Sequence, residues 1–155
     1  TNIAATNASP AWSTTVFLPG DFTFLFNGNP VTEFKVSTSG VLTFTTSAVT
    51  PPTATNAALP SASIPNNSIM IWGLAGSGAN DVIRTKMFGD YPNRQQWIQF
   101  ASYSAPGSTG TNWSYWGIVL EETTNNIYIV DQRTYLTPLT LDWITRPFYQ
   151  TALAD

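Results

Sequence analysis

The stretch from Leu18 to Phe44 reads LPGDFTFLFNGNPVTEFKVSTSGVLTF, and it decides the fold class. Phenylalanines at positions 22, 24 and 26 alternate with Thr23 and Leu25, and this two-residue period is typical of a strand with one strongly apolar face. The Asn27-Gly28 pair that follows predicts a tight hairpin turn, because both residues tolerate a positive φ. The stretch therefore predicts β structure from residue 22 onward.

The strand pattern continues beyond this turn. Residues 31–36 and 41–44 form two more strand-like runs, separated by turn residues that end at Gly40. In the first of these runs the period of two directs Phe34 into the core and Lys35 toward solvent. Three strands joined by short turns predict a meander.

The rest of the chain repeats short strands between turns. Segment 48–67 carries four prolines and cannot form a regular ladder, since proline lacks the backbone donor, so we interpret it as a surface crossover between sheets. This spacing predicts an all-β fold, a two-sheet antiparallel β-sandwich with about eight to ten strands. The further strands are expected at 68–72, 81–88, 95–103, 113–122 and 127–135.

A chain of 155 residues is long enough for one domain with its own core. The pattern divides it into a polar N-terminal segment (1–15), the β-sandwich domain (16–135) and an apolar C-terminal segment (136–155). The last segment is apolar but aperiodic, so it is expected to be either a final strand or an arm that docks elsewhere.

Composition excludes several classes of function. Charged residues make up 10% of the chain, against about 25% in an average domain, and the net charge is −3. With six Lys and Arg residues the chain lacks the basic face that nucleic acid requires. No apolar run approaches the ~20 residues that a membrane-spanning helix needs, so no membrane insertion is expected. A surface so poor in charge is typical of secreted or cell-surface proteins.

Catalysis finds little support in the sequence. The chain contains no cysteine and no histidine, which removes thiol nucleophiles, histidine bases and the usual zinc ligands. Its only adjacent carboxylates, Glu121 and Glu122, lie in a strand-like run and point to opposite faces. We therefore expect no enzyme, no catalytic residue and no cofactor. Asp81 and Asp90 are weak candidates for calcium ligands, and the favoured interpretation is that they serve the turns.

Aromatic residues are the remaining candidates for a binding surface. Trp113 and Tyr115 alternate with Trp116, so both faces of one strand carry an aromatic ring and one face is free to contact a ligand or partner. Trp12, Trp143 and Phe148, in the terminal segments, are further candidate partner contacts.

Several blocks of the chain form a recurring pattern: 18–28 with 34–44, then 69–72, 91–100 and 116–127. Together they resemble a module found near the N-termini of secreted and cell-surface proteins of Bacteroidota, many of them exported by type IX secretion. They occur here in the order found in the module. The resemblance implies a jelly-roll or lectin-like β-sandwich and an extracellular setting, and it implies no reaction. After Trp72 the chain has Gly73-Leu74 where the module often has two acids, so a role for those acids is lost or has moved.

Four residues within these blocks are interpreted as scaffold. Gly28 and Gly40 are expected to supply turn positions with positive φ. Arg94 and Glu122 lie just before and at the end of neighbouring strand runs. We expect them to form a partly buried ion pair that fixes the two strands together.

These observations predict a non-catalytic structural or interaction module of a bacterial surface or secreted protein. Low charge weakens self-repulsion, and Tyr and Trp are enriched at protein interfaces, so self-assembly into a fibre or sheath is the leading hypothesis. Its partners would then be other protein subunits, reached by strands of the terminal segments. The alternative is an adhesion module that binds a glycan through exposed aromatics, Trp113 and Tyr115 first among them.

Overall fold

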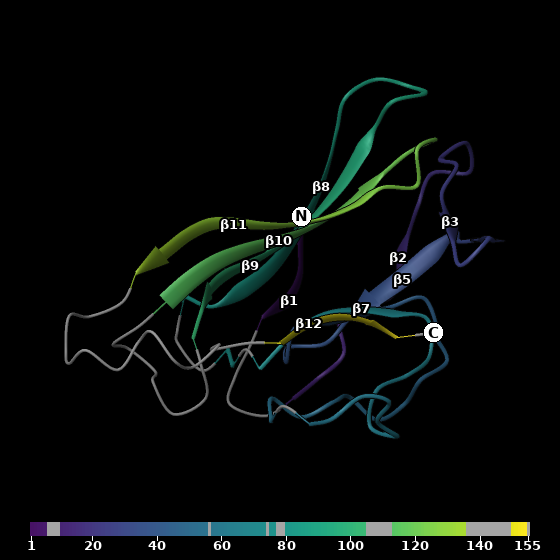
Figure 1. Ribbon diagram of the computed structural model, residues 1–155. Helices are drawn as coiled ribbons and strands as arrows, with labels where there is room; N and C mark the ends of the chain where they lie inside the picture. Colours follow the sequence, from purple (N-terminus) through teal and green to yellow (C-terminus); the bar gives the residue numbers. More distant parts are fainter. Residues whose placement is uncertain are drawn as a thin grey trace.

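The computed structural model describes residues 1–5, 10–55, 57–73, 75–76, 80–104, 113–135 and 150–154. Throughout this part of the chain the secondary structure is β, with no helix. Two five-stranded antiparallel sheets and a two-stranded hairpin form a sandwich, in which the two larger sheets are the layers (Figure 1). The predicted fold class, an all-β antiparallel sandwich, is confirmed.

The first sheet has the strand order β1-β8-β9-β10-β11. Three of its strands, β9, β10 and β11, have nine residues each, and β8 has seven. Each pairs antiparallel with its neighbour, and the register is irregular next to Trp116 in the pairing of β10 with β9 and with β11. The strands are β1 (Asn2–Ala5), β8 (Val82–Phe88), β9 (Gln95–Tyr103), β10 (Trp113–Glu121) and β11 (Ile127–Tyr135).

The second sheet has the order β12-β7-β6-β5-β2. One edge strand of each sheet comes from the beginning or the end of the sequence. The first sheet has β1 at its edge, paired with β8, and the second sheet has β12 at its edge, paired with β7. The strands are β2 (Val16–Phe17), β5 (Glu33–Val36), β6 (Val41–Thr43), β7 (Ser68–Trp72) and β12 (Gln150–Ala154). The separate hairpin consists of β3 (Leu25–Phe26) and β4 (Asn29–Pro30).

The main core lies between the two sheets. The second sheet contributes aliphatic and phenylalanine side chains, and the first adds larger aromatic ones, among them Phe100 and Tyr103 in an edge-to-face pair with centroids 5.4 Å apart. Alternation along the strands directs these residues inward. Phe100 and Tyr103 are three residues apart, and both reach the core because the register of β9 with β10 is irregular between them. The buried set is Phe34, Val36, Leu42, Ile69 and Ile71 on one side and Ile83, Ile98, Phe100, Tyr103, Trp116, Ile118 and Leu120 on the other.

The stretch that predicts the fold class is built differently from a three-strand meander. Phe22, Phe24 and Phe26 are buried, as their alternation indicates. Only the last of them lies in a strand, and that strand pairs with β4 and not with β5. The turn has φ of 49° at Asn27 and 76° at Gly28, which is the pair of positive values that a tight two-residue hairpin requires.

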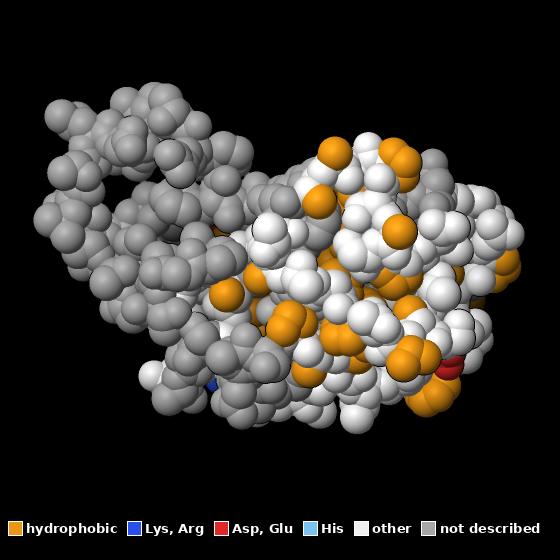
Figure 2. Space-filling model, turned by 90° about the horizontal axis from the view of Figure 1, so that it is seen from below, with side chains coloured by type: hydrophobic (Ala, Val, Ile, Leu, Met, Phe, Trp, Pro, Cys, Tyr) orange, Lys and Arg blue, Asp and Glu red, His pale blue; other side chains and the backbone are white. Residues whose placement is uncertain are grey.

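The proline-rich segment 48–67 joins β6 to β7, which are neighbours in one sheet, so its interpretation as a crossover between sheets is wrong. The segment covers the outer face of the second sheet, where Ile64 packs with Val41 and Met70. Seen from below (Figure 2), the described part of this face carries scattered hydrophobic side chains and almost no charge.

This covering segment explains a second correction. The period of two predicts that Lys35 faces solvent, but the side chain is buried, with 7% of the residue's surface exposed. Its ammonium group donates to the carbonyl of Ala48 and lies 4.7 Å from the centre of the Trp12 ring. Burial lowers the pKa of Lys35, since the charged form loses hydration. The alternation is right for the strand, but a loop covers the face that it assigns to solvent.

Candidate functional site

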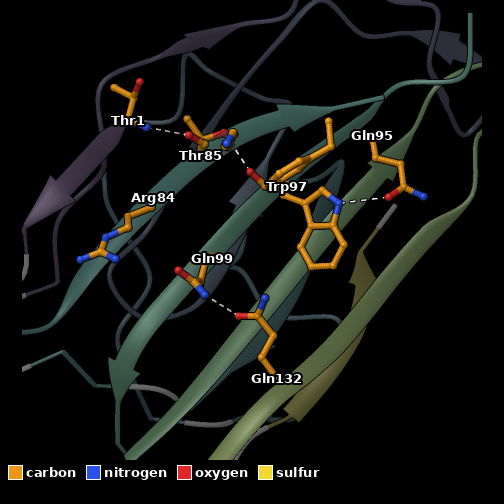
Figure 3. A pocket seen from close by; sticks show the side chains of 9 residues that line it. Thr1, Arg84, Thr85, Gln95, Trp97, Gln99 and Gln132 are labelled. Carbon is orange, nitrogen blue, oxygen red and sulfur yellow. Dashed lines mark hydrogen bonds between the residues drawn. The ribbon is translucent and has the colours of Figure 1, made fainter. Parts of the chain in front are cut away.

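The outer face of the first sheet holds a groove of about 460 Å³ (Figure 3). Ligand sites in proteins are commonly concave and of about 300–1,000 Å³, with an apolar or aromatic lining and a few placed polar groups. This groove has that composition, an indole beside amide and cationic side chains. It is lined by Thr1, Arg84, Thr85, Lys86, Phe88, Gln95, Trp97, Gln99 and Gln132.

Trp97 provides the aromatic surface of the groove. Its indole leans over Gly117 of the adjacent strand β10, so that a Cβ built on that glycine would lie 3.6 Å from Cε3 and 3.7 Å from Cζ3. The ring of Phe88 meets the indole edge-on, with centroids 6.1 Å apart and an interplanar angle of 80°. A Cβ alone would thus be in ordinary contact with the indole, whereas a larger side chain at position 117 would occupy the space in which the indole lies.

A chain of hydrogen bonds fixes the orientation of Trp97. The indole Nε1–H donates to Gln95 Oε1 at 3.1 Å, and Gln95 Nε2 donates to Glu121 Oε1 at 2.9 Å. An ionised carboxylate can only accept, so Gln95 must turn its NH₂ group to Glu121 and its oxygen to the indole. The carboxylate of Glu121 therefore positions Trp97 through Gln95.

Glu121 is itself held by neighbours in the β10–β11 turn. Its Oε2 accepts from Thr124 Oγ1 at 2.6 Å, Asn126 Nδ2 at 2.9 Å and the Tyr128 hydroxyl at 3.2 Å. These donors, with Thr124 the strongest and Gln95 next, lower the pKa of Glu121 to about 2. The group is therefore ionised throughout the neutral range and keeps Gln95 in one orientation.

Two further amides span the groove. Gln99 Nε2 on β9 donates to Gln132 Oε1 on β11 at 2.6 Å, across the intervening strand β10. The irregular register makes this possible, because Asp131 pairs with Trp116 and Arg133 with Tyr115, which leaves Gln132 as an extra residue in β11. A bulge of this kind redirects a side chain. Each amide retains polar atoms that can meet a ligand hydroxyl.

Cations line the groove on the β8 side. Arg84 pairs in register with Gln99, and Lys86 pairs with Trp97. The ammonium group of Lys86 lies 4.8 Å from the centre of the Phe88 ring, and Arg84, Lys86 and Phe88 are all exposed. Among the described residues that line the groove, none carries a carboxylate.

The predicted platform residues Trp113 and Tyr115 lie on the same outer face, since positions 113, 115 and 117 alternate along β10. Trp116 is buried on the opposite face, with 6% exposure. The two rings pack edge to face with centroids 5.6 Å apart, and the Arg133 guanidinium lies 4.9 Å from the centre of the Trp113 ring. These rings contact one another and Arg133, and neither lines the groove.

The other candidate contacts are placed as follows. Trp12 is half-buried beneath Lys35 and packs against the cluster formed by Val41, Ile64 and Met70. Trp143 and Phe148 lie outside the described residues.

The expected scaffold residues have clear structural surroundings. Gly28 and Gly40 have φ of 76° and 91°. Arg94 forms a two-pronged pair with Glu122, Nε to Oε2 at 2.8 Å and Nη2 to Oε1 at 2.7 Å, and it reaches Asp21 at 3.1 Å. Glu122 has no exposed surface.

Backbone donors complete the coordination of the Glu122 carboxylate. The Arg94 N–H donates at 3.1 Å and the Thr23 N–H at 3.4 Å. The side chain of Arg94, followed by these two N–H groups, lowers the pKa of Glu122 to about 2 against the opposing effect of burial. The cluster ties the β8–β9 turn, the β10–β11 turn and the segment before β3 together.

The structure does not bring together the acidic residues considered in the sequence analysis, Glu121 with Glu122 or Asp81 with Asp90. Glu121 faces the outer side of the sheet, whereas Glu122 is buried against Arg94. Asp81 is buried just before β8, and Asp90 is exposed just after it, at the other end of a seven-residue strand, so one ion cannot bind both. Within the described ranges no three acidic side chains come together.

Sequence reasoning did not identify the groove. One signal was present: in the run 95–100, Gln95, Trp97 and Gln99 alternate with residues that are buried. That alternation assigns a tryptophan between two amides to the outer face. Arg84 and Gln132 line the groove, and Gly117 lies beneath the indole. They could not be added, since they come near Trp97 only through the register of three other strands.

The chain is thus a β-sandwich with a groove on the outer face of one sheet. A family model of NIDO-related domains matches residues 1–139, so the chain belongs to the NIDO-related family. The family is generally one of non-enzymatic modules, and membership suggests an extracellular interaction module. No curated protein and no solved structure gives a significant match. In the described residues no helix is long and apolar enough to cross a membrane.

Proposed function

We propose that this chain is a non-catalytic adhesion module of a secreted or cell-surface protein and that it binds a glycan on the outer face of its first sheet. The resemblance to the Bacteroidota module supports a bacterial surface protein exported by type IX secretion. The family supports an extracellular setting. The role is contact with a partner and not chemistry.

The observation that carries this proposal is the Trp97 groove. A sugar ring has an apolar face of C–H groups, which are attracted to the electron-rich face of an indole. Its hydroxyls require donors and acceptors at the edge, and Gln95, Gln99 and Gln132 supply both beside the indole. Preorganisation through Glu121 reduces the entropy lost on binding.

A glycan array with the purified chain tests the proposal. We expect binding that Trp97→Ala reduces by at least about tenfold, since the stacking surface is lost. Trp113→Ala is the matched control, because it removes an aromatic side chain of the same outer face that does not line the groove. Loss of binding in the control but not in Trp97→Ala would move the site to the Trp113 pair.

Self-assembly into a fibre or sheath is a second candidate, favoured by the position of the terminal strands. Strand β1 lies at the edge of the first sheet and β12 at the edge of the second. Edge strands at chain ends can be exchanged between copies at little cost, because the same contacts form again in the neighbour. The partners would then be other copies of this chain.

Sedimentation over a hundredfold range of concentration tests this second candidate. Exchange of terminal strands predicts large species that disappear when residues 1–13 or 136–155 are removed. A melting curve on each truncated chain must accompany the measurement, since both deletions expose an edge of the chain's own sheets. A monomer at every concentration would exclude assembly by this chain alone and leave glycan binding.

A further inference from the structure

We propose that the Trp97 groove selects acidic saccharides, those with a carboxylate or sulfate on the ring, over neutral ones. This inference rests on the proposed glycan-binding function and adds the chemical class of the ligand. It comes from the charges around the groove, from the strand register that aligns them with the indole, and from the shape of the binding surface.

The groove differs in charge from the molecule as a whole. The chain has a net charge of −3, yet two cations, Arg84 and Lys86, line the groove, and no carboxylate does among the residues that the structure describes. The nearby carboxylate of Glu121 lies behind Gln95 and accepts four hydrogen bonds from side chains. The groove therefore presents positive charge to a ligand on a protein that is acidic overall.

The register places each cation beside a different part of the binding surface. Lys86 is the cross-strand partner of Trp97, and Arg84 is the partner of Gln99. Directly paired residues of antiparallel strands have Cβ atoms about 5 Å apart. A sugar ring stacked on the indole thus has an ammonium group at its edge, and the next ring along the groove meets a guanidinium, which can bind a carboxylate or sulfate by two parallel hydrogen bonds.

The shape of the site favours a saccharide over an acidic peptide. Trp97 and Gln99 lie on β9, the central strand of the sheet, so the aromatic surface is two strands away from either edge. An extended peptide gains most of its affinity from backbone hydrogen bonds at a sheet edge. A ring-shaped ligand with hydroxyls instead matches an indole surrounded by amides.

Isothermal titration calorimetry at low salt tests the selectivity. The probes are oligogalacturonate, oligoalginate and sulfated galactan oligomers, each compared with its methyl-esterified or desulfated counterpart. We expect at least one acidic oligomer to bind about tenfold more tightly than its neutral counterpart. Arg84→Gln should reduce that difference, because a charge-assisted hydrogen bond to the acidic group is lost while Lys86 remains.

Arg133→Gln is the matched control, since it removes an exposed cation of the same sheet face that lies over Trp113 and outside the groove. It should keep the difference between acidic and neutral oligomers. Acidic and neutral oligomers that bind equally through Trp97 would overturn the selectivity and retain the glycan function. Failure of every oligomer, acidic or neutral, would overturn the glycan function itself. Tighter binding of an oligoglutamate peptide would overturn the saccharide class.

Discussion

Arg94 is the centre of a network of hydrogen bonds and ion pairs at one end of the sandwich. It binds the Glu122 carboxylate with two nitrogens, reaches Asp21, and lies 5.6 Å from the centre of the Phe22 ring. The partner carboxylate has no exposed surface. Removal of one member of a buried ion pair is costly because the other charge is left without compensation.

Replacement of Arg94 by methionine should therefore destabilise the chain strongly. We expect the melting temperature of Arg94→Met to fall by at least about 10 °C, as measured by circular dichroism. The double variant Arg94→Met/Glu122→Leu should recover part of the loss, because it also removes the orphaned charge. An unchanged melting temperature in the single variant would mean that the pair contributes nothing to stability.

At the scale of the strand, a glycine on β10 lets the indole of Trp97 lie over that strand. A Cβ at Gly117 would be in ordinary contact with the Trp97 indole, at 3.6 Å. Larger groups beyond the Cβ would occupy the space in which the ring lies. Valine is a good strand former, so a valine at this position should alter the groove while the sheet persists.

We expect Gly117→Val to displace the indole and Gly117→Ala to be tolerated. The indole N–H resonance of Trp97, whose donor bonds to Gln95, should shift markedly in a ¹⁵N-correlated NMR spectrum of the valine variant and little in that of the alanine variant. Saccharide affinity should fall by about tenfold in the valine variant only. Equal spectra for both variants would show that the glycine does not create the space for the ring.

The β3–β4 hairpin provides a second test at this scale. Gly28 has φ of 76°, and a Cβ added there would meet nothing within 4 Å, so only the backbone conformation opposes a side chain. Gly28→Ala should cost about 1–2 kcal/mol of unfolding free energy in denaturant melts. Gly20 has equally open surroundings and no positive φ, so Gly20→Ala is the control and should be neutral or slightly stabilising. Similar losses in both would contradict the turn assignment.

The elements also show what sequence could and could not predict. The strands from β7 to β11 match the expected ranges to within one residue. The reason is that the alternation of buried and exposed side chains and the turn residues that bound each strand are local features of the sequence. The predicted pairing of β3 in a meander and the predicted crossover of segment 48–67 between sheets were wrong. Both depend on which strands pair with one another in the folded chain, and a local pattern does not contain that information. The burial of Lys35 and the groove around Trp97 depend on what lies above a sheet face, which no local period contains.

For the whole molecule, charge is scarce and its arrangement sets the response to pH. With no histidine and no cysteine, the side chains that commonly titrate between about pH 5 and 8 are missing. The carboxylates Glu121 and Glu122 both have a pKa of about 2 in the folded chain, against an ordinary 4.5. The contribution of these two carboxylates to stability should therefore be constant near neutrality and change in acid.

The direction of that change follows from the lowered pKa values. Above about pH 4.5 both carboxylates are ionised in the folded and the unfolded chain, and their full contribution to stability is present. As the pH falls from about 4.5 to about 2, the unfolded chain binds protons first and the contribution is lost. Differential scanning calorimetry should show a constant melting temperature from about pH 8 to about pH 5 and a steady fall below it. Glu121→Gln should make the fall shallower, since one of the two groups no longer titrates. If the melting temperature of the unchanged chain stayed constant down to about pH 2, that result would contradict the hydrogen-bonded state of both carboxylates.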